Sequence, residues 1–420
     1  MSGDPVEDDS ADWAAYFRDL TARHRRCFWL DGGGARAWSG RRSMIGYVAD
    51  DGLSLTYDGA RGEVTRHHAG SRDVVGDDPF AALESELKAG PPDAHWVGYF
   101  GYSARPDLSA RPDPHLPDAV WMRADELQFF QHDLPPRPAT PSPQAATAPP
   151  PGDYAAAFAE VQEQLRAGNS YEVNLTYRVE TASALPPPEA YLRLRALNPA
   201  PYAGYLQHDV EGARAWLLSS SPERYALITA DRLLETKPIK GTTPRGATPE
   251  DDERLRAHLA SDPKFRAENL MITDLLRNDV AMVAEPGTVE VPSLMEVESY
   301  ASVHQLVSTI RGRLSDVVTP VGALRALFPA GSMTGAPKLR TMQVIDAVEA
   351  TPRGVYAGAF GWVGADGRAD LGVVIRSLTT AGDGLWRLGT GGGITVRSDA
   401  AEEYDESRWK AERLLAVFAP

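Results

Sequence analysis

Short strand-like segments recur along this 420-residue chain without the regular alternation of strand and long helix that a parallel sheet requires. Trp216–Ser219, Arg224–Thr229 and Arg232–Glu235 follow one another closely, and Ala230-Asp231 forms a turn between the last two. This spacing predicts successive antiparallel strands. Many antiparallel strands interrupted by helices favour an α+β fold with the helices outside the sheets.

Helix boundaries are marked by local capping signals. A helix is expected from Asp153 to Ala167 and another after Thr248, where a capping hydroxyl precedes Pro249, Glu250 and Asp251. Ser261-Asp262-Pro263 opens a helix that we expect to run through Leu276, and the last helix is expected over about 401–418.

Composition divides the chain into four parts. Residues 1–12 carry five acids and no Lys or Arg, which predicts a solvated, flexible tail. Residues 13–133 form an N-terminal part of the fold. Residues 134–152 contain eight prolines in 19 positions and are expected to be a Pro/Ala-rich linker. Residues 153–420 form the second, larger part.

The charge balance and cysteine content exclude several classes of function. A formal charge of −15 argues against a nucleic-acid partner bound through its phosphates. A single cysteine, Cys27, excludes a disulfide framework and a thiolate metal centre. Because no apolar run is long enough to span a membrane and the acidic N-terminus is no signal peptide, we expect no membrane association and a cytoplasmic location.

Three carboxylates on two predicted helices are candidate ligands of a hard cation. Glu403, Glu406 and Lys410 share one face of the last helix. Glu268 lies in line with the buried stripe of the helix after Ser261. Carboxylate oxygens suit Mg²⁺. A solvated charged face and a salt bridge from Glu268 to Arg277 remain the alternatives.

Three further residues stand where charge is costly. Arg376 interrupts an expected strand over 371–378 that is apolar on both faces, so it either pairs with an internal acid, which is favoured, or binds an anionic ligand. Lys240 ends an apolar strand, where burial would lower its pKa and supply a nucleophilic amine, although a solvent-exposed lysine is the common alternative. Glu223 is a candidate general acid, with pairing to Arg224 or Arg245 as the default.

These segments together resemble the chorismate-utilising enzymes, which include anthranilate, aminodeoxychorismate, isochorismate and salicylate synthases. The resemblance runs from Gly168 to Lys410 in the family's order. It implies a fold of two large antiparallel β-sheets packed as a sandwich with helices outside. It is carried by SPER (221–224), PIKGTTPRG (238–246), ENLMITDLLRND (268–279), FPAGSMTGAPKLR (328–340), RGVYAGAFGW (353–362), VVIRS (373–377), GGGI (391–394) and EEYDES (402–407).

Within the family, Lys240 resembles the aminodeoxychorismate branch, in which that amine attacks C2 of chorismate. Ammonia then adds at C4 and expels the lysine, an amination of the transaminase class. Glu223 is similar to the general acid that protonates the departing 4-hydroxyl. Glu172 stands where the water-using members carry a lysine, which argues against isochorismate or salicylate synthesis. Asn269 also resembles the aminodeoxychorismate branch.

The resemblance implies roles for the other positions. Glu268, Glu403 and Glu406 would hold Mg²⁺ against the ring carboxylate. Arg376 and Tyr356 would bind the enolpyruvyl carboxylate, helped by the backbone of Gly391 and Gly393. The same pocket would be lined by Gly241, Thr242, Thr334 and Lys410.

Other features leave alternatives open. Cys27 does not lie in a glutaminase nucleophile turn, so ammonia is expected from a separate glutamine amidotransferase subunit. Gln305 replaces a histidine usual in the family, and His304 should face the opposite side of its strand. Trp29–Gly32 and Asn198–Tyr202 are the counterparts of a tryptophan pocket in anthranilate synthases. Anthranilate synthesis by C2 amination, or a non-catalytic subunit that binds chorismate or tryptophan, are the alternative functions.

Overall fold

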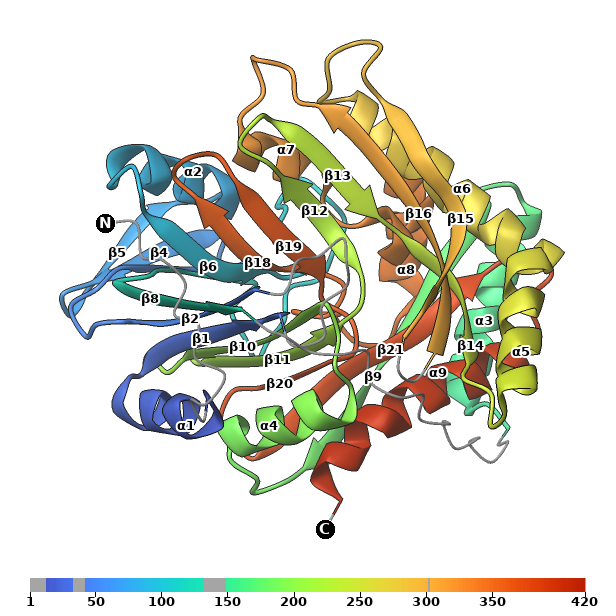
Figure 1. The fold of residues 1–420 in the computed structure, drawn as a ribbon, viewed down its shortest axis with the longest axis horizontal. Helices are drawn as coiled ribbons and strands as arrows, with labels where there is room; N and C mark the ends of the chain where they lie inside the picture. The colour runs from blue at the N-terminus through green and yellow to red at the C-terminus, as the bar shows by residue number, and fades with distance from the viewer. Residues whose placement is uncertain (1–12, 33–41, 132–148, 301–302, 420) are drawn as a thin grey trace.

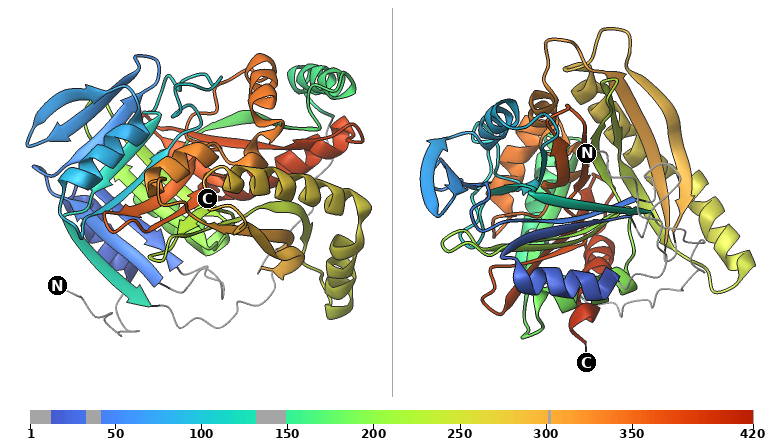
Figure 2. Two further views of the ribbon diagram at one scale, coloured as in Figure 1. Left: turned by 90° about the horizontal axis from the view of Figure 1, so that it is seen from above. Right: turned by 60° about the vertical axis from the view of Figure 1, so that its left-hand side comes forward.

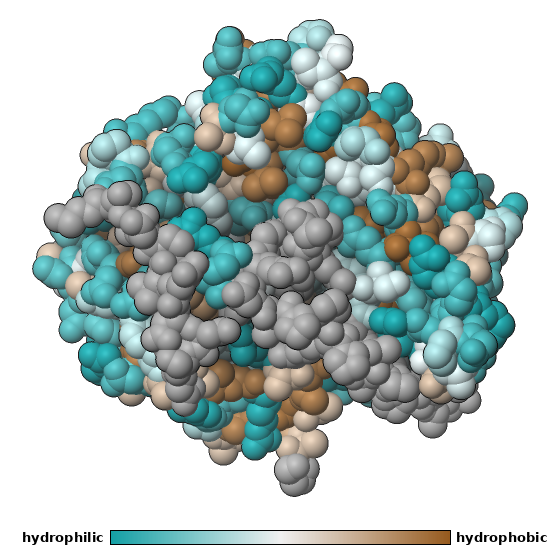
Figure 3. Space-filling model, viewed as in Figure 1, coloured by the Kyte–Doolittle hydropathy of each residue, from teal (hydrophilic) through white to brown (hydrophobic). Residues whose placement is uncertain are grey.

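The computed structural model describes residues 13–32, 42–131, 149–300 and 303–419. The predicted acidic tail, and the proposed linker up to residue 148, lie outside these ranges. None of the helices in the described ranges is long and apolar enough to cross a membrane. On the face drawn in Figure 3, hydrophobic residues form small patches among hydrophilic ones.

The first sheet, here called sheet A, has nine antiparallel strands, which come from both ends of the sequence. The C-terminal strand β21 lies beside β9 along ten paired residues, from Leu385↔Ala182 to Ile394↔Val173. In spatial order the strands are β17 (Gly335–Ala336), β9 (Glu172–Ala182), β21 (Leu385–Ile394), β20 (Ser377–Thr380), β11 (Ala215–Ser221), β10 (Tyr202–His208), β1 (Arg26–Asp31), β2 (Arg42–Val48) and β8 (Glu126–Gln131).

The second sheet, sheet B, has twelve strands and is likewise antiparallel. Near one end of this sheet, β16 pairs with β13, β14 and, off the main path, β15 (Glu290–Ser299). Apart from β15, the strands lie in the spatial order β14 (Ile239–Pro244), β16 (Val303–Arg313), β13 (Leu233–Lys237), β12 (Arg224–Ile228), β19 (Ala369–Val373), β18 (Ala359–Gly364), β6 (His95–Phe100), β7 (Ala119–Arg123), β3 (Ser54–Asp58), β4 (Glu63–His68) and β5 (Ser71–Gly76).

The two sheets pack face to face, and helices cover their outer faces (Figures 1 and 2). The core between the sheets contains Phe28 of sheet A and Phe360 of sheet B, with their neighbours on both layers. The expected α+β sandwich with helices outside is therefore confirmed. Sheet A packs on α1 (Trp13–Arg23), α4 (Pro187–Leu197) and α9 (Ala400–Leu415). Sheet B packs on α2 (Pro79–Ala89), α6 (Pro263–Ala281), α7 (Pro320–Leu327) and α8 (Lys338–Val348). Helix α3 (Gly152–Arg166) packs on β9, and α5 (Pro249–Ser261) packs on β14 to β16.

The helix starts follow the capping signals of the sequence. The Thr248 hydroxyl accepts a hydrogen bond from the Asp251 amide at the start of α5. Asp262 accepts from the Lys264 and Phe265 amides and thereby caps α6. The predicted end of α6 at Leu276 is too early, because the helix continues through Ala281.

The described chain passes between the two sheets six times, and two of these crossings, here called the first and the second crossing, correct a prediction. β11 lies in sheet A but β12 lies in sheet B, so the strands expected to be successive are separated at Ser221–Glu223. The continuous strand expected over 371–378 is instead β19 of sheet B and β20 of sheet A. Arg376 lies at this second crossing, with φ +49°. Apolar residues on both faces of a segment do not show which sheet each half joins.

Candidate active site

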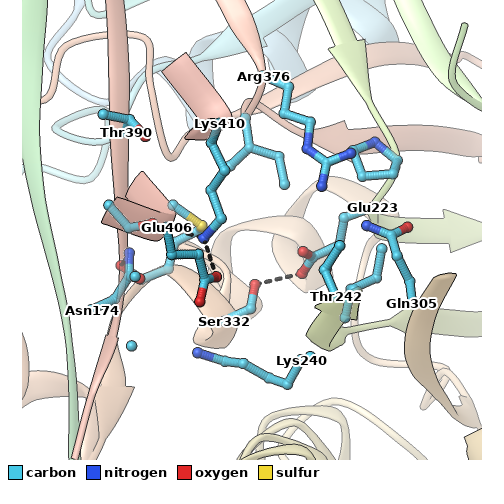
Figure 4. Close-up of a pocket in the computed structure, with 18 of the residues that line it drawn as sticks. Asn174, Glu223, Lys240, Thr242, Gln305, Ser332, Arg376, Thr390, Glu406 and Lys410 are labelled. Carbon is cyan, nitrogen blue, oxygen red and sulfur yellow. Dashed lines mark hydrogen bonds and ion pairs between the residues drawn. The ribbon is translucent and has the colours of Figure 1, made fainter. Parts of the chain in front are cut away.

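A cavity of about 130 Å³ lies where β9 and β21 of sheet A approach β14, α6 and α9. Figure 4 shows residues of β9, β14, β21, α9 and both crossings around it. Helix α6 adds Lys264, Phe265 and Glu268 to its lining. Of the thirteen predicted site residues, twelve line the cavity: Lys240, Glu223, Gly241, Thr242, Tyr356, Arg376, Gly391, Gly393, Lys410, Glu268, Glu403 and Glu406. Thr334 does not line it: it is fully buried and donates its hydroxyl hydrogen to the Gly331 carbonyl.

Glu223 lies at the first crossing, only 4% exposed, and accepts a hydrogen bond from the Ser332 hydroxyl. Neither default arginine partner binds it, because Arg224 pairs with Glu235 and Arg245 pairs with Asp252. Burial raises the pKa of the Glu223 carboxyl to about 7. The group can therefore carry a proton near neutral pH and donate it.

Lys240 is held on β14 with its amine inside the cavity and its side chain only 10% exposed. The amine donates a hydrogen bond to Glu172 of β9. Our expectation of a lowered pKa is wrong for this structure. Burial alone would lower the pKa of Lys240, but the negative charges of Glu172, Glu268 and Glu223 outweigh it and raise the pKa. The amine is thus a buried ammonium in the absence of a ligand.

Arg376 extends from the second crossing toward the cavity (Figure 4). The favoured expectation of an internal acidic partner is wrong, since its guanidinium makes no hydrogen bond or ion pair with any residue that the structure describes. Burial lowers its pKa to about 10, and Arg413 adds to this effect. A desolvated cation without a partner beside a cavity is suited to an anionic ligand.

The three glutamates expected to bind a cation reach the cavity from α6 and α9. Burial raises the pKa of Glu268 to about 7, and its Oε1 atom is buried without a hydrogen-bond partner. The expected alternative pair is not formed, because Arg277 binds Asp274. Lys264 Nζ lies 3.1 Å from Glu403 Oε1, and Lys410 Nζ lies 2.8 Å from Glu406 Oε1.

This donor set fits a hard divalent cation. All its ligand atoms are carboxylate oxygens, and the orphaned oxygen of Glu268 lacks the partner that a buried carboxylate requires. Lys264 and Lys410, which form ion pairs with Glu403 and Glu406, must move away before these carboxylates can bind a cation. Within the described ranges, no three acidic, histidine or cysteine side chains are already grouped closely enough to bind an ion.

Several cavity residues were not assigned to the site from the sequence. Gln305 is 1% exposed and its Oε1 atom has no hydrogen-bond partner. His304 faces away, bonded to Ser299 and Asp252, as strand alternation predicts. Local spacing could have indicated Lys264, four residues before Glu268. Four others stand in segments that carry the family resemblance, although no role was assigned to them: Ser332, Met333, Ile375 and Gly392. No comparable signal marks Asn174, Gly389 or Thr390.

A second cavity, of about 410 Å³, lies at the other end of sheet A. It is lined by Leu30 and Asp31 together with Pro201 and Tyr202, so the two expected counterpart segments meet there. Asp31 is 3% exposed and forms an ion pair with Arg195.

An unpaired arginine, a protonatable glutamate and a lysine amine around one small cavity can hold a carboxylated molecule while a proton and a nucleophile act on it. The fold and the site thus define an enzyme. The chain belongs to the family of chorismate binding enzymes, whose sequence profile matches residues 26–416.

Comparisons with individual proteins agree with this family. The chain is 40% identical to the aminodeoxychorismate synthase of Streptomyces pristinaespiralis over 98% of its own length, and it spans 64% of that longer protein. It is 36% identical to aminodeoxychorismate synthase component 1 of Salmonella typhimurium, with 88% of each chain covered. Anthranilate synthase component I of Streptococcus pneumoniae has a similar structure, with a TM-score of 0.74 and 25% identity over 89% of this chain and 92% of that one.

Proposed function

We propose that the protein converts chorismate and ammonia to 4-amino-4-deoxychorismate through a covalent adduct on Lys240. The observation that carries this proposal is the position of the Lys240 amine inside a cavity that also contains an acid and an unpaired arginine. Capping C2 with the amine directs the incoming nitrogen to C4. The names of the two relatives in Streptomyces and Salmonella support this reaction.

The cavity residues divide the work of the reaction. Arg376 and Tyr356 bind the enolpyruvyl carboxylate, assisted by the backbone of Gly391 and Gly393. Glu223 donates its proton to the 4-hydroxyl as that group departs, and Ser332 keeps the carboxyl in place. Thr242, Gly241 and Lys410 complete the walls around the substrate.

Glu268, Glu403 and Glu406 are the residues that would hold Mg²⁺. The ion would neutralise the ring carboxylate of the substrate, which otherwise faces an acidic protein. We further propose that ammonia comes from a separate glutamine amidotransferase subunit, which the designation component 1 of the Salmonella relative supports.

Product analysis with chorismate, Mg²⁺ and an ammonium salt tests the reaction. We expect 4-amino-4-deoxychorismate from the wild-type protein, none from Lys240→Ala, and full activity from Lys88→Ala, whose lysine is exposed on α2. The Ala variant at 240 should permit at most slow amination at C2, because the covalent block is gone. Anthranilate as the sole wild-type product would favour the other activity seen among structural neighbours.

Mass spectrometry of protein incubated with chorismate but without ammonia tests the adduct directly. The expected result is a mass increase that peptide mapping assigns to Lys240. Steady formation of the 4-amino product by a Lys240→Ala variant would contradict the covalent mechanism.

A further inference from the structure

Glu172, at the start of β9, is a buried carboxylate that touches the proposed nucleophile. Its side chain is 2% exposed, and its Oε1 atom accepts a hydrogen bond from Lys240 Nζ. The second oxygen, Oε2, is buried and has no hydrogen-bond partner among the residues that the structure describes. One oxygen is thus held against the amine, while the other retains unused acceptor capacity.

The strands on both sides of β9 leave space for the Lys240–Glu172 pair. On β21, which pairs with β9, residue 393 is glycine and lies opposite Asn174. A Cβ atom at Gly393 would overlap Glu172 Oε1 and lie 2.7 Å from Lys240 Nζ. On the other side of β9, β17 pairs Ala336 with Glu172. The backbone of three strands therefore fixes the carboxylate beside the amine.

Lys240 cannot attack chorismate until it loses a proton, because the ammonium form has no free electron pair. The glutamates that raise the pKa of the amine most are Glu172, Glu268 and Glu223. Glu223 is bonded to Ser332 and must itself supply a proton, and Glu268 is a proposed metal ligand. Among the described residues, the hydrogen bonds of the Lys240 amine lead to Glu172 alone.

We propose that Glu172 is the catalytic proton acceptor that converts Lys240 from ammonium to nucleophilic amine, and that it returns the proton when the lysine departs. This inference rests on the proposed function. The other charged groups that line the cavity around the pair are Lys264 and Glu268 of α6, Glu223 and Arg376 of the crossings, and Glu403, Glu406 and Lys410 of α9.

The steps balance. A proton passes from Nζ to Glu172, and the freed electron pair forms the N–C2 bond while the ring double bonds shift and the C4–O bond breaks. The hydroxyl takes the Glu223 proton and leaves as water. Ammonia then forms the C4–N bond, the double bonds shift back, and Lys240 departs as a neutral amine. Glu172 returns its proton to Lys240, and the new C4 ammonium gives one back to Glu223.

The test measures how fast the Lys240 adduct forms when protein is mixed with chorismate and Mg²⁺ without ammonia. Quenched samples are quantified by intact mass, and the dissociation constant of chorismate is measured separately. In the Glu172→Gln variant we expect the adduct on the same residue, formed at least about 100-fold more slowly, with an unchanged dissociation constant. Glu160→Gln, an exposed glutamate on α3, should match the wild type.

A Glu172→Asp variant separates the carboxylate from the shape of the site. It should form the adduct faster than the Gln variant, because it keeps a proton acceptor. A Gln variant that forms the adduct at the wild-type rate would overturn the role of Glu172 and leave the covalent mechanism intact. The role of Glu172 would also be overturned if the Glu172→Asp variant formed the adduct as slowly as the Gln variant while binding chorismate normally. Absence of any adduct in the wild type would instead reject the proposed function.

Discussion

At the scale of single residues, burial decides what each carboxyl group can do. Among the described residues Glu223 forms no ion pair and accepts a hydrogen bond from one hydroxyl, so burial outweighs the nearby positive charges and raises its pKa to about 7. Glu406, bonded to Lys410, has its pKa lowered by that lysine. The first group is suited to donate a proton near neutral pH, whereas the second stays ionised and available to a cation.

The raised pKa of Glu223 has a consequence for stability. An unfolded glutamate titrates near pH 4.3, so between about pH 4.5 and 7 the carboxyl of Glu223 is protonated to a greater extent in the folded protein than in the unfolded chain. The contribution of Glu223 to stability is therefore lost as the pH rises through this window. We expect Glu223→Gln to raise the free energy of unfolding at pH 8 by up to about 3 kcal/mol, and by little at pH 4.

Denaturant unfolding of both proteins at the two pH values measures this difference. The same variant should lose at least about 100-fold in turnover at pH 7, because an amide cannot donate the required proton. Equal stabilisation at both pH values would show that the charge of Glu223 is not the cause.

The electrostatic state of Lys240 could not be predicted from its own strand. The motif around it predicted correctly that this residue reaches the cavity. Its partner Glu172, however, lies 68 residues earlier and in the other sheet. A pKa depends on all the charges nearby in space. The local sequence therefore predicted where the amine lies, but it predicted a lowered pKa for Lys240 where the structure raises it.

At the scale of elements, the glycines of β21 expose backbone groups to the cavity and leave space for side chains from other elements. Gly391 offers its carbonyl to Lys410 at 3.0 Å, and Gly393 leaves space for the Lys240–Glu172 pair. A Gly393→Ala variant should keep the pairing of β21 with β9, because alanine is allowed at this backbone geometry. It should nevertheless lose most activity, since the added methyl displaces the amine and the carboxylate.

Turnover and thermal unfolding of the Gly393→Ala variant are the measurements. We expect at least about a tenfold loss of turnover without a matching loss of unfolding temperature. Gly76→Ala, at a position with open space beside it, provides the control. Wild-type turnover in the Gly393 variant would show that the pair has more freedom than the strands suggest.

Elements that depend on local chemistry were the predictable ones. Thr248 and Asp262 cap their helices as their residue types indicate, because a cap involves only the next few amides. The break of the strand at Arg376 was not predictable. Its alternating apolar residues fit one long strand equally well, and only tertiary packing assigns the two halves to different sheets.

At the scale of the whole molecule, both sheets share one layer of core side chains. Phe28 is fully buried there among residues of both sheets. We expect Phe28→Ala to lower the free energy of unfolding by about 3–5 kcal/mol. Far-UV circular dichroism and tryptophan fluorescence should follow the same denaturant midpoint, because the layer belongs to both sheets. Separate midpoints would show that the sheets unfold independently.

The first and second crossings, two of those by which the chain passes between the sheets, place Glu223 and Arg376 at the junctions of the layers. Each is therefore tethered covalently to both halves of the sandwich, and a small slip of one layer over the other would misalign proton donor and carboxylate binder together. Such a site is difficult to transfer to another protein. A scaffold that received only one of the two sheets would lack the chain connections that keep Glu223 and Arg376 in position relative to each other. Redesign of specificity is better directed at Phe265 of α6 and Leu414 of α9, which line the cavity but belong neither to the crossings nor to the proposed metal ligands.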